Sequence, residues 1–198
     1  MTDSKPVLVL DPGHGPAGHG SNHMGACYNG LVEAALTWET SQRMKHAIPT
    51  LNGWLYCTRP TPWDTPSLEE RAALANQVNA ALFLSIHYNA VKEPEPRGME
   101  TLYYPGSTKG KLAAAAFQAA LVRQTGAKDR GLKERGDLVV LNSTRCPAVL
   151  VELGFISNPY EAALIRSEPY QAALAQGLVD GLWDALRAIG ALPETRHG

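Results

Sequence analysis

The chain has 198 residues, which fits one domain with a sizeable buried core. Hydrophobic residues make up 44% of it and charged residues 19%, as in an ordinary globular protein. The net charge of −1 gives no electrostatic basis for binding nucleic acid or an anionic membrane, and no apolar run is long enough to cross a bilayer.

The ends of the chain and its cysteines bear on domain number, export and the oxidation state of the thiols. We expect residues 1–198 to form a single domain, with a core from about residue 6 to 190 and no separate module. No basic region followed by an apolar segment precedes the first expected strand, so no signal peptide is visible. The chain is then made in the cytoplasm and kept there or exported by another route, unless the sequence is already processed. Cys27, Cys57 and Cys146 form no C-x-x-C pair, and we expect reduced, buried thiols.

Strands and helices alternate along the first half of the chain. The apolar run 7–11 predicts a strand, and the spacing of Val32, Leu36, Met44 and Ile48 predicts a helix over 31–48. A short strand is expected over 53–58. Ser67 followed by Glu70 is a capping box, which predicts a helix that runs to about Asn79.

The second half continues the same alternation. The expected strands are 81–88, 99–104, 137–141 and 147–152, and the expected helices are 108–125, 159–166 and 168–190. This order predicts an α/β three-layer sandwich, with a mixed, mostly parallel sheet of about six strands flanked by helices. Functional side chains should then gather at the edge where the strands end.

Three ionisable side chains satisfy that expectation. His14 and His87 follow apolar runs, and Glu152 ends a third such run. Two imidazoles and a carboxylate can hold a catalytic zinc ion with one open position, while a further carboxylate acts as general base. His14, Glu33 and His87 can be the ligands, and Glu152 can be the general base and acid. Asp11 is a candidate to orient His14.

Each of these residues also has a structural interpretation. A histidine after Pro-Gly can be a turn residue, and Glu33 at a helix start can simply favour the helix dipole. Glu152 is different, because a carboxylate between Val151 and Leu153 in so apolar a strand is costly unless it is paired. Taken together, the four positions favour a functional site.

Three longer segments stand out: 10–15 (Leu-Asp-Pro-Gly-His-Gly), 85–90 (Ser-Ile-His-Tyr-Asn-Ala) and 150–159 (Leu-Val-Glu-Leu-Gly-Phe-Ile-Ser-Asn-Pro). They resemble the signatures of a known enzyme family, the zinc-dependent N-acetylmuramoyl-L-alanine amidases called Amidase_3. Supporting matches are Thr58-Arg59, 68–71, Ala75-Asn76, 98–101 and 130–132. They occur in the family's order from about residue 6 to 187, so the resemblance covers nearly the whole chain.

The resemblance implies a reaction and a set of roles. It implies one Zn²⁺ per chain on His14, Glu33 and His87, with Glu152 catalytic. The bond cleaved would be the amide between the lactyl group of N-acetylmuramic acid and L-alanine in peptidoglycan. Asn89, Arg71 and Glu100 are candidates to contact the substrate or the ligands, although Arg71 fits a structural salt bridge better.

The chain departs from the family pattern in two places. The segment from Pro16 to Gly30 carries His19 and His23, which can compete as ligands, contact substrate or simply be solvated. The surroundings of Glu33 are more apolar than is usual in the family, which leaves Glu39 as the alternative carboxylate ligand.

Some members of the family carry a helix after the Ser-Ile-His strand that plugs the zinc site. Here only Val91 to Arg97 separate Ala90 from Gly98, and two prolines interrupt them, so we expect an open site that needs no protein activator. With no visible signal peptide, this favours an endolysin that is released to act on the cell wall in the periplasm. The alternatives are an exported housekeeping amidase, a zinc amidase for another acyl-amino acid, and a non-catalytic peptidoglycan-binding module.

Overall fold

A six-stranded sheet forms the centre of the molecule. The computed structural model describes residues 6–16, 24–48 and 54–192. The sheet has the order β4-β1-β5-β8-β6-β7. Its strands are β1 (Leu8–Pro12), β4 (Leu55–Cys57), β5 (Leu82–Asn89), β6 (Met99–Tyr103), β7 (Asp129–Glu134) and β8 (Ala148–Phe155). Neighbouring strands are parallel except β6 and β8, which confirms the mixed, mostly parallel sheet.

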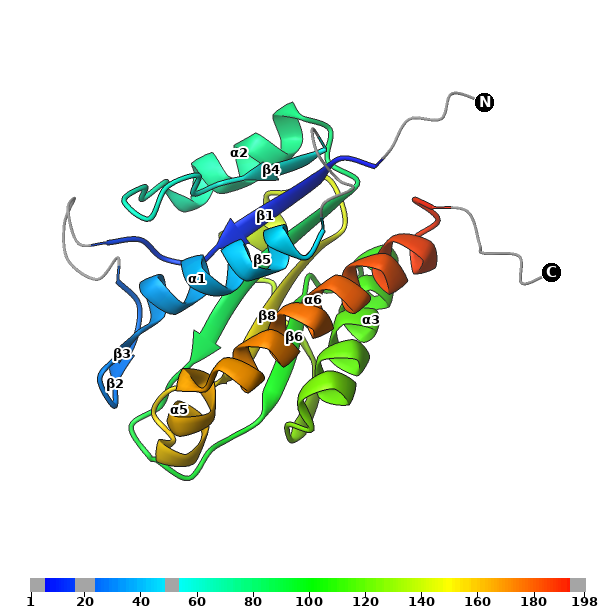
Figure 1. Ribbon diagram of the computed structural model, residues 1–198. Coiled ribbons are helices and arrows are strands. Elements are labelled where there is room, and N and C mark those ends of the chain that lie inside the picture. The colour runs from blue at the N-terminus through cyan, green and yellow to red at the C-terminus, as the bar shows by residue number, and fades with distance from the viewer. Residues whose placement is uncertain (1–5, 17–23, 49–53, 193–198) are drawn as a thin grey trace.

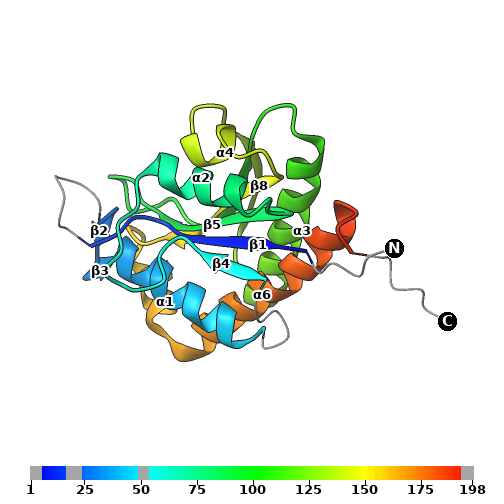
Figure 2. The same ribbon diagram turned by 90° about the horizontal axis from the view of Figure 1, so that it is seen from above.

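Helices cover both faces of this sheet, as the sequence predicted. They are α1 (Glu33–His46), α2 (Leu68–Gln77), α3 (Thr108–Thr125), α4 (Val139–Asn142), α5 (Pro159–Arg166) and α6 (Glu168–Ala188). Figure 1 and Figure 2 show α1, α3, α5 and α6 on one face and α2 with α4 on the other. The expected three-layer α/β sandwich is therefore present.

Alternation along the strands divides the core between the two faces. In β5, Leu84 and Ile86 belong to the larger apolar cluster under α1, α3 and α6, whereas Phe83 belongs to the smaller cluster under α2 and α4. His87 has the same parity as Phe83, and Glu152 has the same parity as Leu150 of the smaller cluster. Both polar side chains therefore project toward the face of α2 and α4.

One strand prediction is wrong. Residues 137–141 form no strand; they lead into α4, whose Val140 and Leu141 are buried against the α2 face. The strand lies earlier, at β7, whose sequence Asp-Arg-Gly-Leu-Lys-Glu carries little apolar signal because β7 is an edge strand. A small hairpin of β2 (Cys27–Tyr28) and β3 (Leu31–Val32) also went unpredicted.

Two further features bear on the site. The capping box of Ser67 and Glu70 is present at the start of α2. Residues 90–98 connect β5 to β6 as a loop.

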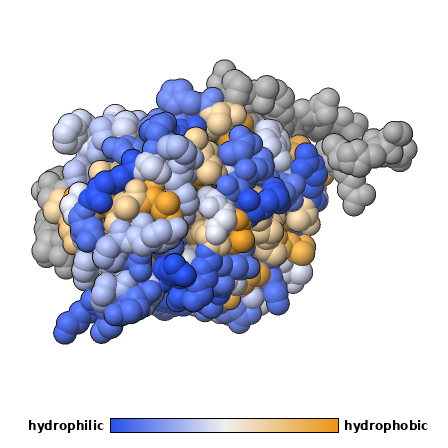
Figure 3. Space-filling model, turned by 60° about the horizontal axis from the view of Figure 1, so that its bottom comes forward, coloured by the Kyte–Doolittle hydropathy of each residue, from blue (hydrophilic) through white to orange (hydrophobic). Residues whose placement is uncertain are grey.

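In the described part of the chain, no helix is both long and apolar enough to span a membrane. The face shown in Figure 3 is largely hydrophilic, with apolar residues in small separate patches.

Candidate metal centre

His14, Glu33 and His87 meet at the carboxyl edge of the sheet. Glu33 lies between the two imidazoles: its Oε2 is 3.1 Å from His14 Nε2, and its Oε1 is 2.9 Å from His87 Nδ1. One potential ligand atom from each of the three residues lies within 4.8 Å of the other two. The chain thus gathers two imidazole nitrogens and one carboxylate into a group that can hold a metal ion.

Three different elements deliver these side chains. His87 lies in β5, His14 follows β1 in a left-handed conformation with φ of 60°, and Glu33 is the first residue of α1. Gly13 allows the close approach, because a Cβ at this position would lie 2.3 Å from His87 Cε1. Only glycine therefore fits between the two histidines.

Glu33 is held by the backbone as well as by the histidines. Its carboxylate accepts hydrogen bonds from the N–H groups of Ala26 (2.9 Å) and Tyr88 (3.2 Å). Burial alone would raise the pKa of Glu33, but the hydrogen bonds and charges of His14 and His87 lower it well below its ordinary value. Glu33 is therefore an anionic, oriented carboxylate.

Glu152 lies across the strands from His87. The two residues are paired in the β5–β8 register, and Glu100 is paired with Glu152 on the other side. The Oε2 atom of Glu152 is buried and has no hydrogen-bond partner within the described residues. Burial, followed by the negative charges of Glu33 and Glu100, raises the pKa of Glu152 well above its ordinary value. A carboxyl group with a raised pKa is a candidate to accept and donate a proton in catalysis.

Glu100 belongs to a small polar network beside Glu152. It accepts hydrogen bonds from Asn89 Nδ2 at 3.2 Å and from Arg130 Nε at 2.9 Å. Arg130 also lies over the ring of Phe155, 4.8 Å from its centroid. The structure therefore brings Asn89 and Glu100 together near Glu152, in contact with each other.

Asp11 and Arg71 are buried and form an ion pair of 2.7 Å. Asp11 also accepts hydrogen bonds from Thr58 and Ser85, so its carboxylate bonds to neither nitrogen of the His14 ring. Arg71 instead donates to the backbone carbonyls of Pro12 and His14. The pair thus supports the loop that carries His14, through its backbone.

Arg59 is a buried residue whose structural role the sequence did not reveal. It is 1% exposed, and its Nη1 donates to the carbonyls of Gly13 and Ala34, each at 3.0 Å. Each of these carbonyls belongs to a residue next to a candidate ligand, because Gly13 precedes His14 and Ala34 follows Glu33. The Thr58-Arg59 motif was the only sequence signal, and burial of an arginine against carbonyls leaves no periodic pattern.

Other residues considered from the sequence lie elsewhere. Glu39 is exposed and lies beyond the first turn of α1, outside the group that can hold a metal. His19 and His23 fall outside the described residues. A groove adjoins the site on the α2 side, lined by His14, His87, Arg71, Leu68 and residues 138–140 of the α4 segment.

Comparisons with known proteins show which family the chain belongs to. The family model Amidase_3, described as N-acetylmuramoyl-L-alanine amidase, matches residues 8–184. The chain is 33% identical to N-acetylmuramoyl-L-alanine amidase LytC of Bacillus subtilis (strain 168), over 88% of this chain but only 34% of that protein. It is 28% identical to the germination-specific N-acetylmuramoyl-L-alanine amidase of the same strain, over 95% of this chain and 83% of the relative.

Solved structures show the same similarity. An N-acetylmuramoyl-L-alanine amidase from Clostridium difficile 630 matches with a TM-score of 0.84 at 30% identity, covering 92% of this chain and 97% of that one. The catalytic domain of CwlV, an amidase from Bacillus (Paenibacillus) polymyxa var. colistinus, matches with a TM-score of 0.83 at 28% identity, covering 92% and 99%. Each match thus covers most of the chain.

Proposed function

The chain belongs to the Amidase_3 family of N-acetylmuramoyl-L-alanine amidases and is a hydrolase of that family, and we propose that it cleaves the lactyl–L-alanine amide of peptidoglycan with one zinc ion held by His14, Glu33 and His87. One observation carries the proposal: a carboxyl group with an unpartnered buried oxygen, Glu152, lies across the strand register from a histidine of the candidate metal group.

The residues present fit zinc. Two imidazoles and one carboxylate are the donor set of many catalytic zinc sites, and Glu33 is kept ionised for this role. A zinc ion bound there supplies Lewis acidity, which polarises the amide carbonyl and makes water more acidic. The Ala26 and Tyr88 backbone N–H groups orient the Glu33 carboxylate, as partners of a ligand do in metal sites.

Glu152 performs the proton transfers in this proposal. Its Oε2 takes the proton of the attacking water and then delivers it to the nitrogen of the departing L-alanine, so the C–N bond breaks with a neutral amine as leaving group and not a strongly basic amide anion. The raised pKa supports the first role, because it makes the Glu152 carboxylate a stronger base than an ordinary glutamate. Glu100 contributes to that pKa and is itself held by Asn89 and Arg130.

We further propose that the enzyme needs no protein activator, since the β5–β6 connection in residues 90–98 is a short loop beside the site. The setting is part of the proposal too: an endolysin acting on the wall after release, with an exported housekeeping amidase as the alternative. Binding to nucleic acid or insertion into a membrane forms no part of it.

The test of this function is digestion of purified peptidoglycan by the chain alone. Wild type should release new amino termini of L-alanine, EDTA should abolish the release, and added Zn²⁺ should restore it. His87→Ala should contain less zinc and show no restoration. If wild type releases nothing yet sediments with the wall, the protein is a binding module and the proposal is wrong.

A further inference from the structure

Four polar side chains form a row across four neighbouring strands. His87 of β5 is paired with Glu152 of β8, and Glu152 is paired with Glu100 of β6. Residues paired in this way project from the same face of a sheet, here the face of α2 and α4. Arg130 of β7 continues the row, because its Nε donates to Glu100 Oε2 at 2.9 Å. The row therefore runs from the candidate metal group to the edge strand β7.

A β-bulge accompanies Arg130 at the end of this row. The register between β6 and β7 shifts between Met99 and Thr101, so Arg130 and Gly131 together lie opposite Glu100. Gly131 has a φ of 74°, which glycine adopts without strain. Bulges of this kind change the direction of a neighbouring side chain and are frequent beside active sites. We attribute the contact of Arg130 with Glu100 to this bulge.

The Arg130 guanidinium is held on two sides and open on a third. Its Nε edge bonds to Glu100, and its Cζ lies 4.8 Å from the ring centroid of the buried Phe155. Among the described residues, neither Nη nitrogen donates a hydrogen bond to the protein. The Arg130 side chain is 30% exposed, against 13% for Glu100, so a ligand can reach it. A fixed guanidinium with free donors suits a carboxylate, which it can bind through both oxygens.

The acidic side chains around Arg130 leave these donors free. Each acidic residue of the segment 129–137 is bonded to another partner: Asp129 to Gln118, Glu134 to Tyr103, and Asp137 to Arg135. Arg135 is thereby engaged through both its Nε and its Nη2. Arg130 is therefore the arginine of this segment that is better placed to receive a carboxylate from outside the protein.

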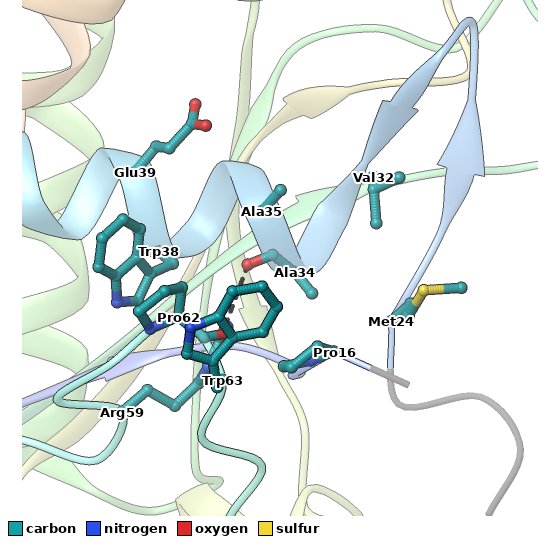
Figure 4. Close-up of a pocket in the computed structure, with 10 residues that line it drawn as sticks. All are labelled: Pro16, Met24, Val32, Ala34, Ala35, Trp38, Glu39, Arg59, Pro62 and Trp63. Carbon is teal, nitrogen blue, oxygen red and sulfur yellow. Dashed lines mark hydrogen bonds between the residues drawn. The ribbon is translucent and has the colours of Figure 1, made fainter. Parts of the chain in front are cut away.

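The other hollows around the metal group offer no comparable cation. The groove on the α2 side and the cavity beside α1 (Figure 4) are both lined mostly by apolar residues. An arginine lines each of them, but Arg71 donates to Asp11 and to backbone carbonyls, and Arg59 donates to backbone carbonyls. A negatively charged group of a substrate therefore has its counterpart at Arg130.

We infer that Arg130 forms an anion subsite, which binds a carboxylate on the peptide side of the scissile amide and favours acidic over neutral stem peptides. Two strand spacings, roughly 10 Å in all, separate the backbones of Glu152 and Arg130. The arginine side chain covers part of this distance, and two residues of extended peptide reach at most about 7 Å. The carboxylate therefore belongs to the residue that follows L-alanine. This inference rests on the proposed function for its substrate.

The experiment compares two muramoyl tripeptides that differ in one group. In both, L-alanine is followed by a γ-linked D-glutamate and a lysine amide, and the α-carboxylate of the D-glutamate is either free or amidated. Wild type should show a kcat/KM about tenfold higher for the acid than for the amide, the size of one charge-assisted hydrogen bond. Arg130→Gln should bring this ratio close to one through the KM of the acid, and Arg130→Lys should retain part of the preference.

Arg123→Gln is the matched control, because it removes an exposed, ion-paired arginine from α3, on the other face of the sheet. It should keep the wild-type ratio. The inference is overturned if wild type does not distinguish the two substrates. It is also overturned if Arg130→Gln loses activity equally toward both, since Arg130 would then only hold Glu100 in place.

Calorimetric titration with the two free tripeptides, which lack the muramoyl group, measures the subsite without catalysis. Wild type should bind the acid about tenfold more tightly than the amide, and Arg130→Gln should bind both alike. Equal binding of the two peptides by wild type would overturn the inference. If wild type prefers the acid peptide through Arg130 but cleaves neither substrate, the subsite stands and the proposed amidase function fails. If it cleaves both substrates equally well, the function stands and the subsite fails.

Discussion

At the scale of single residues, two buried arginines hold the loop that carries His14. Arg71 donates to the carbonyls of Pro12 and His14, and Arg59 donates to the carbonyl of Gly13 between them. Three consecutive carbonyls are therefore fixed by guanidinium groups. This matters because His14 adopts a positive φ, a conformation that costs energy for a residue with a Cβ.

The first prediction concerns Arg59. Arg59→Ala removes the hydrogen bonds that hold the carbonyls of Gly13 and Ala34 in place. We therefore expect zinc affinity to fall about 10- to 100-fold, as for other residues that orient metal ligands. Arg59→Lys keeps the charge and should recover part of this loss. Competition with a chromophoric zinc chelator measures the affinity. Arg43→Ala, which breaks an exposed ion pair with Glu168, is the control; equal affinities for all these proteins would refute the positioning role.

Asp11 makes a prediction about pH. Burial would raise its pKa, but the charge of Arg71 and the hydrogen bonds of Ser85, Thr58 and Arg71 outweigh this and lower it below 3.8. A carboxyl group with a lowered folded pKa stabilises the fold above its unfolded pKa, and that stabilisation is lost as the pH falls through the folded pKa.

Asp11→Asn should therefore lower the free energy of unfolding by about 3 kcal/mol at pH 7, since it leaves Arg71 buried without its partner. The difference from wild type should shrink as the pH falls below 3.8. Urea unfolding at pH 7 and near pH 3 provides both values. A difference that does not change with pH would show that the Asp11 charge is not responsible.

At the scale of elements, α3 and α6 pack closely through glycines. A Cβ at Gly181 would lie 2.6 Å from Phe117 Cδ1 and 2.9 Å from Phe117 Cα. The second contact is with backbone, which cannot turn away, so the close approach of the helices depends on this glycine.

Gly181→Ala should destabilise the protein by about 1–3 kcal/mol through overpacking, although alanine is the better helix former by about 1 kcal/mol. Gln176→Ala, on an exposed position of the same helix, should change stability by less than about 0.5 kcal/mol. Thermal unfolding of the two variants gives the comparison. A more stable Gly181→Ala protein would mean that the helices can move apart at little cost.

Elements with strong local signals were the ones the sequence could predict. The apolar runs predicted β1, β5 and β8, and the capping box at Ser67 predicted the start of α2. The strand prediction over 137–141 was wrong, because the β-branched residues of Leu138-Val139-Val140-Leu141 favour a strand while their contacts with α2 fold the segment as α4. The approach of His14 and His87 could be predicted because parallel strands end at one edge of the sheet, whereas Glu33 lies at the start of a helix. The carbonyl contacts of Arg59 depend on tertiary packing and could not.

At the scale of the whole molecule, the site joins both layers of the sandwich. Glu33 comes from α1 on one face of the sheet, while His87 and Glu152 project toward the face of α2 and α4. The loop of His14 closes the group at the sheet edge, between the groove on the α2 side and the cavity beside α1.

The most direct test of this account measures turnover and zinc content together for Glu152→Gln. Glutamine keeps the size of the side chain but cannot take up the proton of water. The account predicts one zinc per chain in this variant, as in wild type, with muropeptide turnover lower by about 10²- to 10⁴-fold. Turnover near the wild-type value, or loss of zinc along with activity, would contradict the role of Glu152 as the residue that moves the proton.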